Sequence, residues 1–154
     1  VDANDLVVSV ANTFHLKVEK YGGTLDIDLQ ATESDIYVDE MHITNVLFNL
    51  MDNAVKYRRN EVPLTLMVRT WNENGKLLLS VEDNGIGIKK EYQKKVFDRF
   101  FRVPTGNVHD VKGFGLGLAY VRKIIEDHKG TIRAESGEGN VGTKFIITLP
   151  LIKS

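Results

Sequence analysis

The sequence predicts an α+β domain, a two-layer sandwich in which helices cover one face of a mixed, mostly antiparallel sheet. Three observations support this prediction. Long segments carry apolar residues at helical spacing, shorter segments alternate apolar and polar residues as strands do, and a turn typical of a hairpin joins two of the strands. Strands and helices mixed along a chain in this way favour one layer of each.

Four segments are predicted to be helices. Residues 2–21 and 39–58 repeat apolar residues three or four positions apart, and shorter helices are expected over 89–101 and 116–128. Gly22-Gly23 and Gly130 mark the ends of the first and last of these helices, because glycine readily ends a helix. The apolar positions of the two long helices are Leu6, Val10, Phe14 and Val18, and Ile43, Leu47, Leu50 and Ala54.

Six segments are predicted to be strands, and one long segment is predicted to be a loop. The residues from Asn72 to Gly75 supply the hairpin turn between two of the strands. Residues 103–115 include Pro104 and three glycines and have little apolar content, so we expect a flexible lid there. The expected strands are 25–29, 36–38, 64–68, 77–81, 131–134 and 143–149.

The composition bounds the function. The 154 residues include 20 Lys and Arg against 21 Asp and Glu, a net charge of -1 that supports neither a nucleic-acid surface nor direct contact with an anionic membrane. Cysteine is absent, which excludes disulfides and thiol chemistry. The chain starts at Val1 and runs directly into a helical pattern, so we expect residues 1–154 to be a single domain excised from a longer protein.

The first candidate motif is a polar stripe on the helix predicted over 39–58. Asn49, Asn53, Lys56 and Tyr57 fall on one face, turned away from the apolar face. A carboxamide oxygen suits Mg²⁺, a hard cation that takes few protein ligands beside nucleotide phosphates, so Asn53 is a candidate metal ligand. Lys56 could reach a phosphate, and Tyr57 could lie against a base or ribose. The alternative is a polar outer face without a ligand.

The second motif is Asp83 followed by Gly85 and Gly87, directly after a predicted strand. A carboxylate there can accept a hydrogen bond from the exocyclic amine of adenine, and the two glycines let the backbone approach a flat ligand. We expect Ile86 and Ile88 to supply apolar walls for the ring. The alternative is a simple hairpin turn at Asn84-Gly85.

The third motif is a second glycine run that opens the helix predicted over 116–128. Backbone N–H groups at a helix start favour phosphate, so Gly113, Phe114, Gly115, Leu116, Gly117 and Leu118 are candidates for nucleotide contact. The run is neither a Walker loop nor a dinucleotide fingerprint. Near the end of the chain, Thr143 belongs either to a turn before the last strand or to the contacts of an adenine-bound water.

The fourth motif is the aromatic segment that precedes the expected lid. Its three phenylalanines, Phe97, Phe100 and Phe101, are expected to pin the base of the lid by packing. Arg99 and Arg102 flank them. Each arginine is either a phosphate contact, a solvated side chain or a partner of Asp98.

In this order and spacing, the four motifs resemble the catalytic and ATP-binding domain of sensor histidine kinases, over about residues 1–150. The polar stripe corresponds to the N box of that family, the two glycine segments to its glycine boxes, and the Phe97–Arg102 segment to its F box. The family has the Bergerat fold, which it shares with DNA gyrase, mismatch-repair and heat-shock-chaperone ATPases.

The resemblance implies a domain that binds Mg²⁺ and ATP and donates the γ-phosphate to a histidine. Asn53 would hold the metal ion, and Asn49, Lys56 and Arg102 would act on the phosphates. The remaining nucleotide contacts would be Tyr57, Asp83, Gly85, Gly87, Ile88, Thr143 and the second glycine run, from Gly113 to Leu118. The expected setting is a cytoplasmic domain of a membrane-anchored sensor in a two-component system.

Two departures narrow this expectation. The related ATPases carry a glutamate, the base for the attacking water, where this chain has Asn49, and an amide cannot take a proton. The chain also lacks the family's phosphoacceptor histidine box, so the expected partners are the phosphoacceptor histidine domain of the same protein and a response regulator. The alternatives are an ATPase of the gyrase type and a serine kinase of the anti-sigma-factor type.

Overall fold

The computed structural model describes residues 1–99, 101 and 114–152, with the backbone alone for residues 114–116. The elements follow in the order α1 (Ala3–Lys20), β1 (Thr24–Leu29), α2 (Glu40–Lys56), β2 (Thr65–Glu73), β3 (Lys76–Asp83), 3₁₀ turns at Lys90–Tyr92 and Lys95–Phe97, α3 (Phe114–Asp127), β4 (Thr131–Ser136), a 3₁₀ turn at Glu138–Asn140, and β5 (Thr143–Pro150).

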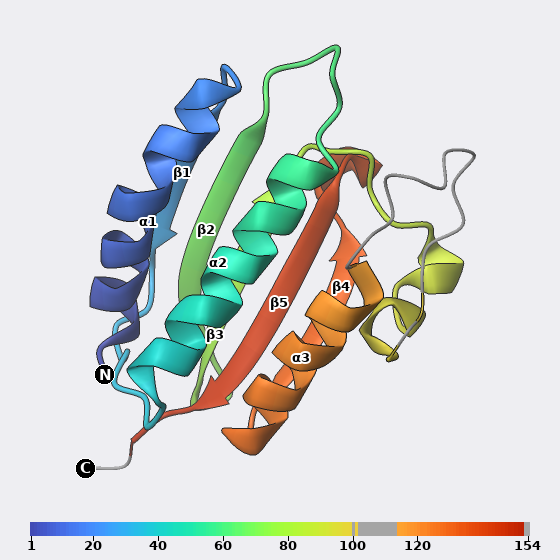
Figure 1. The fold of residues 1–154 in the computed structure, drawn as a ribbon. Helices are drawn as coiled ribbons and strands as arrows, with labels where there is room; N and C mark the ends of the chain where they lie inside the picture. Colours follow the sequence, from blue (N-terminus) through green and yellow to red (C-terminus); the bar gives the residue numbers. More distant parts are fainter. Residues whose placement is uncertain (100, 102–113, 153–154) are drawn as a thin grey trace.

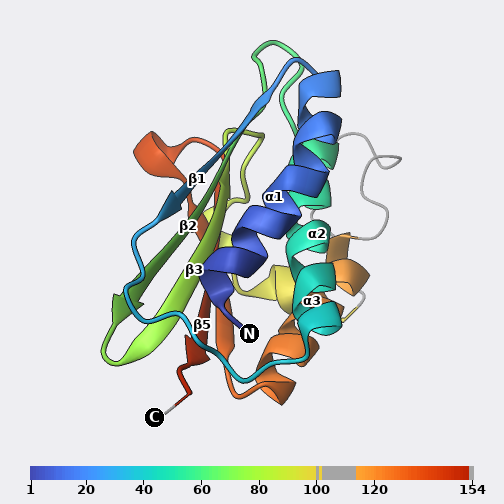
Figure 2. The same ribbon diagram turned by 90° about the vertical axis from the view of Figure 1, so that its left-hand side faces the viewer.

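The five strands form one mixed sheet in the order β1-β2-β3-β5-β4. β1 pairs with β2 in parallel, and the other neighbours are antiparallel. The helices α1, α2 and α3 all lie on one face of this sheet (Figure 1), and the side view shows one layer of helices against one layer of strands (Figure 2). The predicted two-layer α+β sandwich with a mostly antiparallel mixed sheet is therefore confirmed.

Local sequence explains where the long helices begin and where the hairpin turns. The Asp2 carboxylate accepts hydrogen bonds from the N–H groups of Asn4 and Asp5 at the start of α1, and Asp39 accepts one from the His42 N–H at the start of α2. Between β2 and β3, Asn74 and Gly75 both have positive φ, as the tight hairpin turn requires.

The apolar faces of the helices and the sheet meet in one core. α2 lies over the centre of the sheet, packed against α1 and α3, and its buried face faces β3 and β5. The largest fully buried side chains are Ile36, Ile43, Leu47, Leu50, Met51, Leu64, Leu66, Leu77, Leu79, Leu118, Ile125 and Ile147. Among the described residues, no helix combines the length and the apolar character needed to cross a bilayer.

The structure corrects three of the predicted elements. The segment 36–38 is not a strand: Ile36 makes a single bridge to Leu151, because the chain turns at once into the cap of α2. The segment 89–101 forms two 3₁₀ turns instead of a helix, since adjacent side chains at Val96 and Phe97 are both buried and Asp98 is extended. α3 begins at Phe114, two residues earlier than predicted, so the last two residues of the expected lid 103–115 are helical, and residues 103–113 lie outside the described residues.

Leu79→Ala tests the core at its centre. Leu79 is 1% exposed on the central strand β3, between Thr70 of β2 and Ile147 of β5. Removing its side chain leaves a cavity, so we expect a loss of about 2–4 kcal/mol in the free energy of unfolding, measured by urea denaturation. Leu16→Ala on α1, where the side chain is 66% exposed, is the control and should change stability by less than about 0.5 kcal/mol.

Candidate functional site

Asp83 ends β3, and backbone groups from two directions hold its carboxylate. The N–H groups of Gly85 and Thr143 donate to Asp83 Oδ1 at 2.8 and 3.3 Å. Burial raises the pKa of the Asp83 carboxyl to about 6, and the nearby charge of Glu82 also raises it, while the two N–H groups oppose that rise. Both donors use the same oxygen, so Oδ2 can accept from a bound group.

Glycines allow the backbone to cross closely beside this carboxylate. Gly142 has φ of +69°, and a Cβ there would lie 1.9 Å from the Asp83 carbonyl oxygen. A Cβ at Gly85 would lie 2.5 Å from the carbonyl oxygen of Tyr57, to which the Ile86 N–H donates at 3.0 Å. Gly87 has φ of +77° and faces Gly142. These glycines are therefore required by contacts within the protein, whatever ligand they also approach.

One narrow cavity brings six of the predicted contacts together. Its lining comes from the end of α2, the turn after β3 and the start of β5, and it has room for about one water molecule. Six of the residues that line it are predicted from the sequence, and Phe145 is not. The lining residues are Asn53, Tyr57, Asp83, Gly87, Ile88, Thr143 and Phe145.

The structure corrects the expected pair of apolar walls. Ile88 is 6% exposed and lines the cavity, whereas Ile86 is 59% exposed and does not line it. The side chain of Phe145 supplies the second apolar wall, and its ring meets the Phe97 ring edge-on at 6.1 Å between centroids. The alternation of β5 places Phe145 on the inner face, which is the signal that could have found it.

Asn53 is a buried polar side chain in the lining of this cavity. It is 8% exposed, and its Nδ2 has no hydrogen-bond partner among the described residues. A buried amide group without a partner costs free energy, so a residue of this type persists where a ligand can satisfy it. The unpartnered Nδ2 therefore fits an acceptor atom of a ligand, and the carboxamide oxygen is of the type that a hard cation binds.

The other residues of the polar stripe on α2 point to different places. Asn49 is half-buried and faces α3, where its Oδ1 would lie 3.3 Å from a Cβ at Gly117, and Lys56 is exposed. Leu118 is fully buried in the core, below the start of α3.

Several predicted contacts cannot be placed. Arg102 and Gly113 lie outside the described residues, as does Phe100. Phe114, Gly115 and Leu116 form the first turn of α3, and their side chains are not described. Arg99 stands beside the outer surface of α3, near Tyr120 and Arg122, and the Asp98 carboxylate pairs with Arg122 at 3.7 Å.

Asn84 fixes the turn after Asp83. Its Oδ1 accepts from the Thr65 N–H at 2.8 Å, its Nδ2 donates to the Pro63 carbonyl, and its own carbonyl accepts from Arg59 Nε at 2.9 Å. These bonds tie the turn to the loop between α2 and β2. Asn84 therefore has a structural role beyond forming the turn with Gly85.

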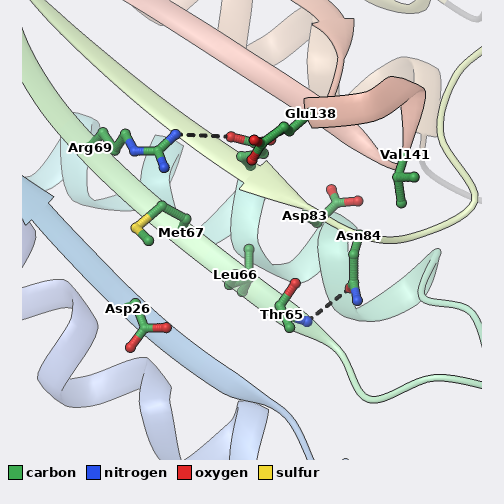
Figure 3. Close-up of a pocket in the computed structure, with 10 residues that line it drawn as sticks. Asp26, Thr65, Leu66, Met67, Arg69, Asp83, Asn84, Glu138 and Val141 are labelled. Carbon is green, nitrogen blue, oxygen red and sulfur yellow. Dashed lines mark hydrogen bonds and ion pairs between the residues drawn. The ribbon is translucent and has the colours of Figure 1, made fainter.

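Asp83 also borders a groove on the face of the sheet opposite the helices (Figure 3). In this groove Arg69 pairs with Glu82 at 3.2 Å, and the carboxylates of Asp26 and Glu138 stand at its sides. Among the described residues, no group of three or more His, Cys, Asp or Glu side chains is arranged to hold a metal ion.

Comparison with known proteins places this geometry in a family. Residues 38–153 match the family described as histidine kinase-, DNA gyrase B-, and HSP90-like ATPase. The chain is 70% identical over 154 residues to Sensor protein RprX of Bacteroides fragilis, covering all of this chain and 30% of RprX. It is 42% identical over 120 residues to Sensor histidine kinase WalK of Bacillus subtilis, covering 77% of this chain and 20% of WalK.

The chain is similar to solved structures of the histidine kinase ThkA as well. A nucleotide-free catalytic domain of ThkA aligns with a TM-score of 0.76 and 29% identity, over 97% of this chain and 94% of that chain. ThkA in complex with the response regulator protein TrrA aligns with a TM-score of 0.78 and 27% identity, over 99% of this chain and 41% of that chain. The chain thus spans less than a third of the length of both curated relatives.

Asp83→Asn tests how much the buried charge of the carboxylate lowers the stability of the fold, because the variant keeps the shape of the side chain. Asn can accept the same two N–H groups but carries no charge. Because the folded-state pKa is raised, from 3.8 to about 6, the protonated carboxyl stabilises the fold below pH 4 and this stability is lost as the pH rises through 6. At pH 7 the free energy of unfolding of the variant should exceed that of the wild type by at most about 3 kcal/mol, because one pKa unit corresponds to about 1.4 kcal/mol.

The measurement is urea denaturation of both proteins without nucleotide at pH 4, 5, 6 and 7. The advantage of the variant should grow across that range. A difference that stays constant with pH would show that the Asp83 carboxylate is not held out of water.

Proposed function

The chain belongs to the family of histidine kinase-, DNA gyrase B- and HSP90-like ATPases, and we propose that it binds Mg²⁺·ATP and donates the γ-phosphate to a histidine on a separate domain. The observation that carries the proposal is that Asp83 and the buried Asn53 line the same cavity. We further propose that residues 1–154 form one catalytic domain of a membrane-anchored sensor kinase, located in the cytoplasm.

The adenine end of the nucleotide is assigned to Asp83. Its Oδ1 is held by the N–H groups of Gly85 and Thr143, so Oδ2 is positioned to accept from the exocyclic amine of adenine. Guanine carries a carbonyl at that position, which would oppose the carboxylate. Ile88 and Phe145 form the apolar walls for the ring. Because the cavity is narrow, binding requires these side chains to open around the base.

The metal and phosphate end is assigned to α2 and the start of α3. Asn53 would hold Mg²⁺ through its carboxamide oxygen, and the ion when bound would neutralise phosphate charge. Lys56, exposed at the last turn of α2, would contact a phosphate. The backbone N–H groups of the first turn of α3 would face the phosphates. Asn49, next to Gly117, would support this turn. We also propose that Arg102 contacts the phosphates.

Transfer to a protein acceptor is favoured over transfer to water. Where the related ATPases carry a glutamate, this chain has Asn49, and its amide cannot take a proton from an attacking water. The domain therefore contributes positioning and charge neutralisation, the main requirements of phosphoryl transfer. The acceptor would be a histidine of the same protein's dimerisation domain, and the phosphate would pass on to a response regulator.

Asn53→Ala tests the metal end, with Asn45→Ala as its control on an exposed turn of the same helix. Calorimetric titration with ATP should give at least a roughly tenfold loss of affinity for Asn53→Ala in the presence of Mg²⁺, from the loss of a charge-assisted ligand. In EDTA the two variants should bind ATP about equally. Wild-type affinity of Asn53→Ala for Mg²⁺·ATP would refute the role of this residue, as would wild-type autophosphorylation of the full-length protein carrying it.

Asp83→Asn tests the adenine end through nucleotide selectivity. The wild type should prefer ATP over GTP by roughly tenfold or more, because only adenine offers a donor to the carboxylate. The amide can present a donor to the carbonyl of guanine, so the preference should fall towards one in the variant. Competition of ATP and GTP against a fluorescent ATP analogue measures both ratios. Unchanged selectivity would place the base elsewhere.

A further inference from the structure

His128 joins the end of one nucleotide-site helix to the start of the other. It follows Asp127, the last residue of α3, and its Nδ1 lies 2.7 Å from the carbonyl oxygen of Ile124 in the same helix. Its Nε2 lies 3.1 Å from the backbone N of Asp39, the residue that caps α2. The ring therefore bridges two helices that are far apart in the sequence.

The two partners fix the protonation state of the ring. A carbonyl oxygen can only accept, so Nδ1 carries the proton and donates to Ile124. A backbone N–H can only donate, so Nε2 is the acceptor for Asp39. The bridge thus needs a neutral imidazole of one tautomer. The Asp39 carboxylate and the His42 ring, edge-on at 6.1 Å between centroids, are the titratable groups that face it.

The same two helices meet again at the phosphate end. α2 and α3 pack together in opposite directions, because Asp39 at the start of α2 contacts His128 after α3, and Asn49 further along α2 lies next to Gly117 in the first turns of α3. The 14 residues of α3 make a rod of about 20 Å. The buried face of α3, with Leu118, Val121 and Ile125, packs the helix into the core, and the two contacts near its ends add to that packing in setting where its first turn lies.

We propose that His128 is a positioning residue for the phosphates of the nucleotide. It acts through α3: the hydrogen bond to Asp39 anchors the far end of the helix, and this anchor holds the backbone N–H groups of the first turn against the phosphates. The inference rests on the proposed function, since it assigns the phosphates to that turn. It predicts that loss of the anchor weakens binding of the triphosphate and leaves recognition of the base unchanged.

Two isosteric variants separate the two hydrogen bonds of the ring. The Oε1 atom of glutamine stands as many bonds from the backbone as Nε2 of histidine, so His128→Gln keeps an acceptor for the Asp39 N–H. The Nδ2 atom of asparagine matches Nδ1, so His128→Asn keeps the donor to Ile124 and loses the link to α2. A role within α3 alone would make His128→Asn the milder change, and a link between the helices would make His128→Gln the milder one.

The experiment measures the affinities of Mg²⁺·ATP and of AMP by NMR titration for the wild type and both variants, with thermal unfolding to confirm that each is folded. His128→Asn should weaken Mg²⁺·ATP about five- to tenfold, the typical value of one hydrogen bond, and leave AMP unchanged. His128→Gln should bind both ligands within about twofold of the wild type. Amide exchange of Gly117–Tyr120 without nucleotide should rise in His128→Asn alone.

Several results would overturn the inference. The first is that His128→Asn weakens the binding of Mg²⁺·ATP and of AMP equally. The second is that His128→Asn keeps the wild-type affinities and the wild-type amide exchange. The third is that His128→Gln binds Mg²⁺·ATP as weakly as His128→Asn does. The exchange measurement keeps the two proposals apart. If the wild type binds no Mg²⁺·ATP but exchange rises in His128→Asn as expected, the link between the helices holds, and the proposed function fails together with the role assigned to the phosphates.

Discussion

The site depends on one carboxylate that the fold holds partly out of water. Asp83 would be more stable in the fold if it were neutral, since burial raises its pKa to about 6. The backbone compensates only in part, through the N–H groups of Gly85 and Thr143. That arrangement exists because β3 and β5 are neighbours in the sheet and because Gly142 lets the chain pass directly beside Asp83. A residue that costs stability and is still held by two separate segments is typical of a binding site.

The layers of the fold bring the second half of the site to this carboxylate. α2 crosses the inner face of the sheet so that its last turns end at the cavity, where Asn53 is buried against the sheet and Tyr57 closes the lining. The bond from the Ile86 N–H to the Tyr57 carbonyl fixes the end of α2 to the turn after β3. α3 packs beside α2 and presents its first turn near Asn49. The helical layer thus carries the groups suited to metal and phosphate, and the sheet carries the group suited to the base.

Much of this could be predicted from the sequence, because the strongest signals are local. Helical and alternating periodicities place the long helices and the central strands. Asn53 of α2, Tyr57 after it and the turn after Asp83 line one cavity, whereas Asn49 and Lys56 do not line it. The failures concern tertiary packing. The alternation of β5 points Phe145 inward, but nothing local shows that this residue, about 60 positions later, replaces Ile86 as a wall while Ile86 turns outward. The segment 89–101 is predicted to be a helix, but burial of the adjacent side chains of Val96 and Phe97 accompanies 3₁₀ turns there instead. Glycine is needed at position 85 because the carbonyl oxygen of Tyr57, the residue that caps the end of α2, lies where a Cβ would be. Only the folded chain reveals this contact.

A crystal structure of the chain with Mg²⁺ and a non-hydrolysable ATP analogue tests the central claim most directly. The account predicts that the exocyclic amine of adenine lies within about 3 Å of an Asp83 carboxylate oxygen, the distance of a direct hydrogen bond, and that the same nucleotide's metal ion is bound by the carboxamide of Asn53. A nucleotide in the outer groove between Asp26 and Glu138, or one that contacts Asp83 but leaves Asn53 unliganded and distant from the metal ion, would contradict it.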